Sequence, residues 1–530
     1  MTTPIPAETA DDARRYRPDP SVLTALTSPR LLTREVLAGL VVGLALIPEA
    51  IAFSIIAGVD PKVGLFSAFI MATSIAFLGG RPAMISAATG AVALVIAPVA
   101  REHGMDMFIA TVMLAGVFQI LLAVFGVAKL IRFIPRSVMV GFVNALSILV
   151  FAAQVPHVIG VPWMVYPLLA IGIAVLVFMP KLTKVVPAPL VTIVLITGIA
   201  VVFAIDVPTV SDQGELPRSL PELFIPHVPL TWQTLSTIAP YSLAMALVGL
   251  MESLMTAKLV DEITDTHSNK TRESWGQGAA NMLSGLFGGM GGCAMIGQTM
   301  INVRASGART RISTFMAGAF LLVLVVVLGD IVGMIPMVAL AAIMMMVCID
   351  TFEWHSIRIS TLRTLPKSET FVMIATVAVV VATGNLAIGV VVGVFVASVL
   401  FVRRVAHFVT VERAIVPPDP DAAGTAADAA ATVADVAGAD STDTEAVAHY
   451  VVRGELFFAS SNDLTTQFHY THDPGRVVID MTESHVWDAS TVAALDAIVT
   501  KYEALGTKVE LRGMNEYTEA LHARLSGGLG

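Results

Sequence analysis

Apolar stretches recur along most of the chain, from about residue 35 to about residue 408. A helix needs about 20 predominantly apolar residues to cross the hydrocarbon core of a bilayer, and many of these stretches reach that length. Their apolar residues would surround a helix on all sides, which is typical of helices that are buried in lipid or in a large core. The pattern therefore predicts an all-α polytopic membrane domain over residues 34–410.

The loops between these stretches differ in their positive charge. We expect 14 spans with an N-terminus in the cytosol, because Lys and Arg then gather in the inner loops, while the outer loops carry only Lys62, Arg101 and Arg218. An even number of spans returns the C-terminus to the cytosol. The expected spans start near residues 35, 63, 83, 106, 137, 162, 187, 238, 273, 293, 310, 331, 369 and 387.

Two of the spans have an interrupted pattern. The third, "RPAMISAATGAVALVIAPVA" (81–100), begins with small residues and becomes helix-like only after Thr89-Gly90. The tenth, "GGMGGCAMIGQTMINVRASG" (288–307), does the same after Gly291-Gly292. Interrupted spans at matching positions of two halves are typical of transporters built from inverted repeats, here of seven spans each. Glycines that only permit close helix packing are the other interpretation.

Half-helices of this kind would begin near the middle of the membrane. Their free N–H groups and positive dipole ends would then face one another and form a binding site for an anion. The candidate anion ligands are the residues around the two expected helix starts, namely Thr89, Gly90, Ala91, Ala294, Met295 and Ile296.

Composition excludes several classes of function. No GxxxxGK[ST] loop is present, so the chain is not expected to hydrolyse a nucleotide, and a solute would move by secondary transport or through a channel. The two cysteines, Cys293 and Cys348, lie in apolar segments and predict neither a disulfide nor a metal site. No nucleophile, base and orienting group can be assembled, so we expect no enzyme and no cofactor. Asp261, Glu262 and Asp265 are interpreted as solvated charges at a span end.

The segments outside the membrane domain differ from it in composition. Residues 1–33 are polar and are expected to form a disordered cytosolic tail. Residues 411–447 are rich in Ala and Asp and are expected to be a linker. Residues 448–527 carry strand patterns at 449–458, 476–481 and 508–514 around a helix at 489–506, which predicts a small α/β domain with parallel strand pairing.

The chain resembles the SulP anion transporters, the bacterial relatives of the vertebrate anion exchangers. The segments that carry the resemblance are "IPEAIAFSIIAGVDPKVGLFSAFI" and "ESLMTAKLVDEITDTHSNKTRESWGQGAANMLSGLFGGMGGCAMIGQTMIN". The C-terminal domain is similar to STAS domains, although Ser490 lies one place beyond the position of their phosphorylated serine. The resemblance implies two inverted repeats of seven spans, a core and a gate domain, a homodimer and an elevator-like movement.

The resemblance also implies roles for four residues. Glu252 and Thr256 lie four residues apart on one helix face, as do the carboxylate and hydroxyl that bind Na⁺ in sodium-coupled members. A proton carrier and a structural carboxylate are the other interpretations of Glu252. Glu49, which follows Pro48, is either a second proton carrier or faces the gate domain. Phe53 resembles the aromatic residue of the family's anion pocket, and a packing role is the alternative.

The expected function is secondary active transport of a small, sulfate-type anion across the cell membrane, coupled to H⁺ or Na⁺. Sodium-dependent bicarbonate uptake and C4-dicarboxylate symport are alternatives, and a nucleobase permease ranks below them. A regulatory membrane protein whose STAS domain recruits a cytosolic partner is a further alternative.

Overall fold

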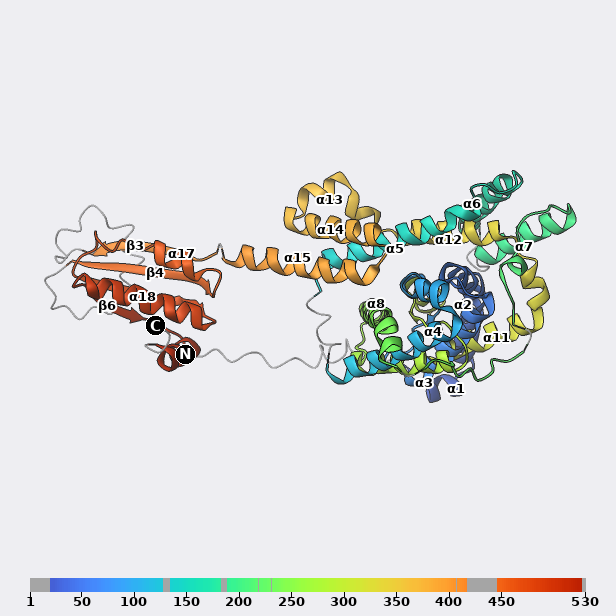
Figure 1. Cartoon of the computed structure of the whole chain (residues 1–530), viewed down its shortest axis with the longest axis horizontal. Helices are drawn as coiled ribbons and strands as arrows, with labels where there is room; N and C mark the ends of the chain where they lie inside the picture. Colours follow the sequence, from blue (N-terminus) through green and yellow to red (C-terminus); the bar gives the residue numbers. More distant parts are fainter. Residues whose placement is uncertain are drawn as a thin grey trace. The chain divides into compact units, whose positions relative to one another are not determined.

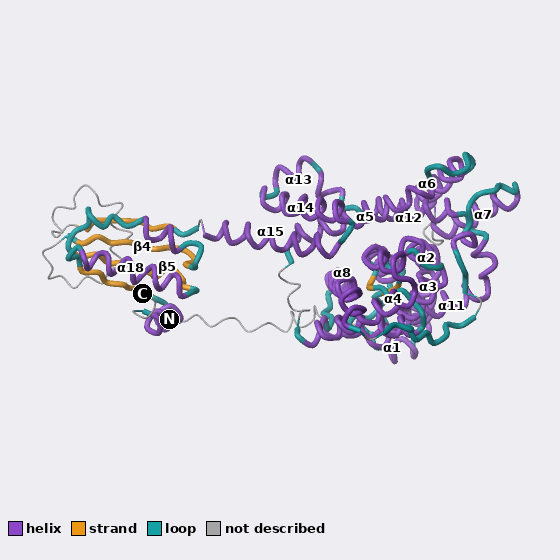
Figure 2. Tube along the Cα trace, viewed as in Figure 1, coloured by secondary structure: helices purple, strands orange, loops and turns teal. Residues whose placement is uncertain are grey.

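The computed structural model describes residues 20–126, 134–182, 188–217, 219–229, 231–406, 408–416 and 446–526. The chain divides into two compact units, Met1–Val394 and Phe395–Gly530. Helices make up nearly all of the first unit, whereas a sheet with helices makes up the second (Figures 1 and 2). Residues 1–19 of the expected tail and 417–445 of the expected linker lie outside the described residues. The tail was predicted too long, because helix α1 (Val22–Thr27) and the first turn of the next helix occupy its end.

The long helices of the first unit begin close to the predicted span starts. They are α2 (Pro29–Ala57), α3 (Pro61–Leu78), α4 (Gly90–Val124), α5 (Arg136–Gln154), α6 (Val165–Leu182), α7 (Ala188–Val202), α8 (Trp232–Thr264), α9 (Lys270–Leu286), α11 (Arg311–Gly333), α12 (Met337–Thr351), α14 (Lys367–Thr383) and α15 (Leu386–Ala406), whose end lies in the second unit. Shorter pieces are α10 (Ile296–Met300) and α13 (Ile359–Thr364).

Within the described residues, eight helices are long and apolar enough to cross a membrane, and α7 and α12 are shorter apolar helices. Helix α4 contains a break at Gly104, whose φ of 80° is left-handed, and it joins the helical part of the third predicted span to the span predicted to start near residue 106. The polytopic all-α prediction is thus confirmed, while the number of 14 spans stays a prediction.

The interruptions predicted in the third and tenth spans are present. Strand β1 (Ser86–Ala87) pairs antiparallel with β2 (Cys293–Ala294). Helix α4 begins three residues after β1, and α10 begins at Ile296, two residues after β2. The chains approach so closely that a Cβ on Gly292 would lie 1.8 Å from the carbonyl oxygen of Ala87, so only glycine fits there. The two-residue ladder places the starts of the two helices beside each other.

The helices form two groups by their contacts. Helices α2, α3, α4, α8, α9 and α11 pack against one another, and α5, α6, α7, α12 and α14 form a second set that contacts the first mainly through α12 and α2. Where α4 crosses α9, Gly116 and Gly278 face each other, and a Cβ on either would lie 2.6 Å from the carbonyl oxygen of the other. Small residues therefore let these two helix backbones touch.

The second unit contains a four-stranded sheet in the order β3-β4-β5-β6. Its elements are β3 (Thr410–Val416), β4 (Val447–Leu456), α17 (Ser461–Thr466), β5 (Arg476–Val486), α18 (Ala489–Ala504), β6 (Lys508–Arg512) and α19 (Glu516–Leu525). The predicted parallel pairing is confirmed for β4 with β5 and for β5 with β6. The predicted linker start at residue 411 was too early, because β3 pairs antiparallel with β4 through residue 416.

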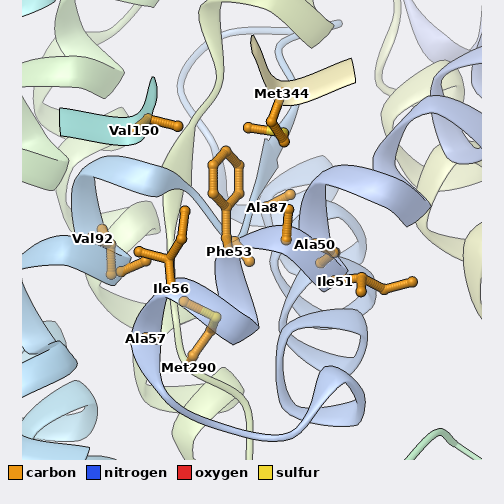
Figure 3. Packing of buried hydrophobic residues seen from close by; sticks show 14 of the residues in the cluster. Ala50, Ile51, Phe53, Ile56, Ala57, Ala87, Val92, Val150, Met290 and Met344 are labelled. Carbon is orange, nitrogen blue, oxygen red and sulfur yellow. The ribbon is translucent and has the colours of Figure 1, made fainter. Parts of the chain in front are cut away.

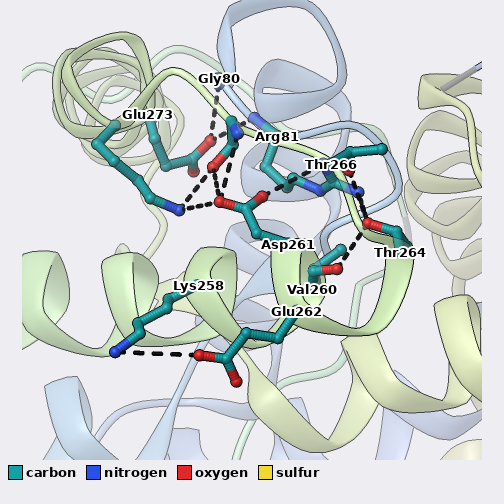
Figure 4. Close-up of polar contacts among 11 residues, drawn as sticks. Gly80, Arg81, Lys258, Val260, Asp261, Glu262, Thr264, Thr266 and Glu273 are labelled. Atoms are coloured by element: carbon teal, nitrogen blue, oxygen red, sulfur yellow. Dashed lines mark hydrogen bonds and ion pairs between the residues drawn. The ribbon is translucent and has the colours of Figure 1, made fainter. Parts of the chain in front are cut away.

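A network of charges joins the C-terminal end of α8 to the segment before β1 (Figure 4). Asp261 accepts an ion pair from Arg81 at 3.3 Å and one from Lys270 at 2.6 Å, and the Asp261 side chain is only 13% exposed. Arg81 also donates to the hydroxyls of Thr264 and Thr266. The interpretation of Asp261 as a solvated charge was therefore wrong, whereas Glu262 forms only an exposed pair with Lys258.

Candidate functional site

The starts of α4 and α10 meet at a cavity of about 100 Å³ in the first unit. Helices α2, α5, α8 and α12 supply its other walls. The cavity is lined by Glu49, Phe53, Thr89, Gly90, Phe142, Val143, Leu146, Ser147, Val150, Glu252, Met255, Met295, Ile296, Gly297, Gln298, Met344, Val347, Cys348 and Thr351. Two carboxylates but no Lys, Arg or His are among these lining residues.

Seven of the ten candidate residues predicted from the sequence line this cavity. They come from four separate parts of the chain and are Glu49, Phe53, Thr89, Gly90, Glu252, Met295 and Ile296. Ala91, Ala294 and Thr256 do not line it. Ala91 and Ala294 are fully buried, and the Thr256 hydroxyl donates to the backbone oxygen of Glu252 at 2.8 Å. A second, open cavity of about 1270 Å³ beside residues 211–224 contains none of the ten.

Phe53 and Gly90 are in close contact at one wall of the cavity. A Cβ on Gly90 would lie 2.8 Å from the Phe53 ring, so the ring covers the first residue of α4 because that residue has no side chain. Figure 3 shows the ring of Phe53 among buried apolar side chains that include Val150 and Met344. Phe53 thus both lines the cavity and packs into the core, so the two interpretations of this residue are not exclusive.

Glu252 is linked to the starts of both interrupted segments through Cys293. The Cys293 thiol donates to Glu252 Oε2 at 2.9 Å and lies 3.1 Å from the Thr89 hydroxyl. Thr89 in turn caps α4 by accepting from the N–H of Val92. No sequence pattern indicates a role for Cys293, because its contact with Glu252 depends on the pairing of β1 with β2.

Glu49 lines the same cavity from α2. Its Oε1 accepts a hydrogen bond from Gln298 Nε2 at 2.8 Å, which joins α2 to α10. Gln298 lies in the first turn of α10, and no sequence pattern pairs it with Glu49, which is 249 positions away. Glu49 therefore faces the cavity together with Glu252, and the two carboxylates belong to one site.

The chemistry of this site is that of a small, mostly apolar cavity that contains a few polar groups. The first N–H groups of a helix have no partner within the helix and can bind anions. Gly90, the first residue of α4, lines the cavity, whereas the N–H of Val92 is already bonded to Thr89. Two buried carboxylates would repel an anion unless a proton or a cation neutralises them. No group of three or more His, Cys, Asp or Glu residues that could hold a metal ion occurs among the described residues.

A polytopic membrane domain with two interrupted helices that meet at a cavity holding two carboxylates, joined to a small α/β domain, is typical of a class of anion transporters. The chain belongs to the sulfate permease family, whose family model matches residues 32–168 and 162–376. A STAS domain model matches residues 439–527. The resemblance to SulP transporters and to STAS domains is thus confirmed, and the family consists of transporters rather than enzymes.

Relatives cover nearly the whole chain. The Bacillus subtilis protein named "Putative sulfate transporter YbaR" is 46% identical over 93% of this chain and 97% of its own length. The bicarbonate transporter BicA of Picosynechococcus is 30% identical over 71% of both chains. Among solved structures, the transmembrane domain of a cyanobacterial BicA matches 70% of this chain and 98% of its own at 25% identity, with a TM-score of 0.58. Murine Slc26a9 shares the fold, with a TM-score of 0.75 at 15% identity, over 100% of this chain and 93% of its own.

Proposed function

We propose that the chain carries a small inorganic anion across the cell membrane by secondary active transport. One observation carries the proposal: the start of α4 and the start of α10 meet at a cavity whose ionisable lining groups are two carboxylates and a thiol. The N–H groups of the helix starts would bind the anion. The relatives named as sulfate and bicarbonate transporters favour these two substrates over a C4 dicarboxylate.

Coupling is assigned to the two carboxylates. An anion that shares the cavity with Glu49 and Glu252 repels both, and moving several uncompensated charges through a membrane is costly. Binding of H⁺ or Na⁺ at Glu252 would remove one negative charge and let the loaded domain move. Thr256 is fully buried and does not line the cavity, which favours H⁺ over Na⁺. The movement is elevator-like in this proposal, in a homodimer whose termini face the cytosol.

Uptake by the full chain in proteoliposomes tests this function. Labelled sulfate, bicarbonate and fumarate are each supplied with an inward proton gradient, an inward sodium gradient or neither. We expect uptake of sulfate or bicarbonate that a proton gradient stimulates. Uptake of none of the three, with correctly inserted protein, contradicts the proposed function, while stimulation by sodium alone reassigns the coupling ion and keeps the function.

A further inference from the structure

The pair formed by Glu49 and Gln298 is only half satisfied. Gln298 Nε2 donates to Glu49 Oε1, but within the described residues Glu49 Oε2 and Gln298 Oε1 are buried atoms without any hydrogen-bond partner. Both residues are almost fully buried, with 6% and 3% of their surface exposed. Buried polar atoms normally have hydrogen-bond partners, and an unpaired one is destabilising. Two unpaired acceptors in one hydrogen-bonded pair of cavity-lining residues therefore point to a ligand or a second state.

The other groups around the pair offer no compensation. The ionisable groups that face it are Glu252 on α8 and Cys348 on α12, with Cys293 behind Glu252. No cationic side chain lines the cavity. In the arrangement seen, the unpaired side-chain atoms of Glu49 and Gln298 are thus oxygen acceptors, which repel an anion.

A single proton reverses this polarity. The oxygen and nitrogen of a glutamine amide occupy nearly equivalent positions, and rotation of the amide by half a turn exchanges them. A protonated Glu49 is a donor, and it pairs best with the carbonyl oxygen of Gln298. The rotation then directs the two N–H groups of Gln298 to the place where its oxygen was, so that the wall becomes a donor surface.

We propose that Gln298 is a proton-driven polarity switch that admits the anion only when Glu49 carries a proton. The inference rests on the proposed function and names a positioning residue for it. The proton comes from the solution on the side of anion entry, stays on the Glu49 carboxyl during the crossing, and leaves on the other side. Because the proton offsets the charge of Glu49, the cavity loaded with a monovalent anion and a proton has the same net charge as the unloaded cavity.

Binding of sulfate to the purified full chain, measured from mildly acidic to mildly alkaline pH, tests the switch, with bicarbonate as a second probe at neutral and alkaline pH. For the wild type, binding of one proton with the anion predicts an affinity that falls by up to about tenfold per pH unit above the pKa of the pair. The variant Glu49→Gln keeps the pair permanently neutral, so the part of the pH dependence that comes from Glu49 should be lost and only that of Glu252 should remain. The variant Gln298→Met removes the donors and should weaken binding about tenfold or more at acidic pH.

The swapped double variant, Glu49→Gln with Gln298→Glu, rebuilds a carboxyl–amide pair and should recover the pH dependence, which a merely structural role for either residue would not do. Gln233→Met, at an exposed glutamine in the first turn of α8, is the matched control for the loss of an amide. The switch is overturned if wild-type binding is independent of pH, if Glu49→Gln keeps the wild-type slope, or if Gln298→Met binds as tightly as the wild type. Wild-type protein that neither binds nor carries any anion at any pH refutes the proposed function itself.

Discussion

The buried carboxylate of the C-terminal unit and the two carboxylates of the cavity are paired in opposite ways. In the C-terminal unit, the fully buried side chain of Asp473 accepts from Arg413 at 2.6 Å and from the hydroxyls of Tyr450 and Tyr502. In the membrane unit, Glu49 and Glu252 each have one side-chain hydrogen-bond partner, and an oxygen of Glu49 has none. A carboxylate whose oxygens are all paired holds a fold together, whereas one that is incompletely paired is free to bind a proton or an ion.

The largest expected effect is that of Glu252→Gln on transport. Because the substitution removes the charge that a coupling ion neutralises, the stimulation of uptake by an ion gradient should fall about 5- to 150-fold, the usual range of a coupling free energy. The thermal stability of the membrane unit should barely change, since the amide still accepts from Cys293. Gradient-stimulated uptake at the wild-type level in proteoliposomes would instead make Glu252 a structural carboxylate.

The same change of carboxylate to amide in the C-terminal unit should act on stability. Asp473→Asn weakens the charged hydrogen bonds from Arg413 and the two tyrosines, each of which is worth about 1.5–3 kcal/mol. We expect the free energy of unfolding of residues 446–526 to fall by about 2–3 kcal/mol. Hydrogen exchange of the full chain measures this loss, and Glu503→Gln, at an exposed position of α18, is the matched control. Equal protection in the two variants would refute the structural role of Asp473.

A smaller effect is expected at Tyr502. Burial, together with its hydrogen bond to Asp473, raises the pKa of this phenol above its ordinary value of 10.0. The folded domain therefore holds the phenolic proton more tightly than the unfolded chain does, so this contribution to stability is complete below about pH 10 and is lost as the pH rises further. Tyr502→Phe should cost about 1.5 kcal/mol at neutral pH and weaken the alkaline loss. Unfolding curves of the wild type and the variant are recorded at neutral pH and above about pH 10. If another group causes the alkaline loss, both proteins will lose the same stability between the two conditions.

Much of the architecture could be predicted from local patterns. The apolar stretches predicted the helices. The small residues up to Thr89-Gly90 and up to Gly291-Gly292 predicted both interruptions, because neighbouring residues alone decide whether the backbone there can be helical. The C-terminal strands and helix were found for the same reason. The predicted boundaries were wrong at the ends of segments. Helices α1 and α2 begin before residue 34, and strand β3 occupies residues 410–416, where pairing with β4 outweighs the polar composition.

The candidate site divides in the same way. The sequence by itself determined that the chain spans a membrane and that two helix starts, Glu49 and Glu252 are its unusual features, since charged and interrupted segments are conspicuous in an apolar background. Only the tertiary structure decided which of them share a cavity. It placed Cys293 against Glu252 and Gln298 against Glu49, and it turned the Thr256 hydroxyl to its own helix. These contacts depend on how helices that are distant in sequence pack together. A single hydrogen bond between two such helices produces no repeating pattern of residue types from which it could be predicted.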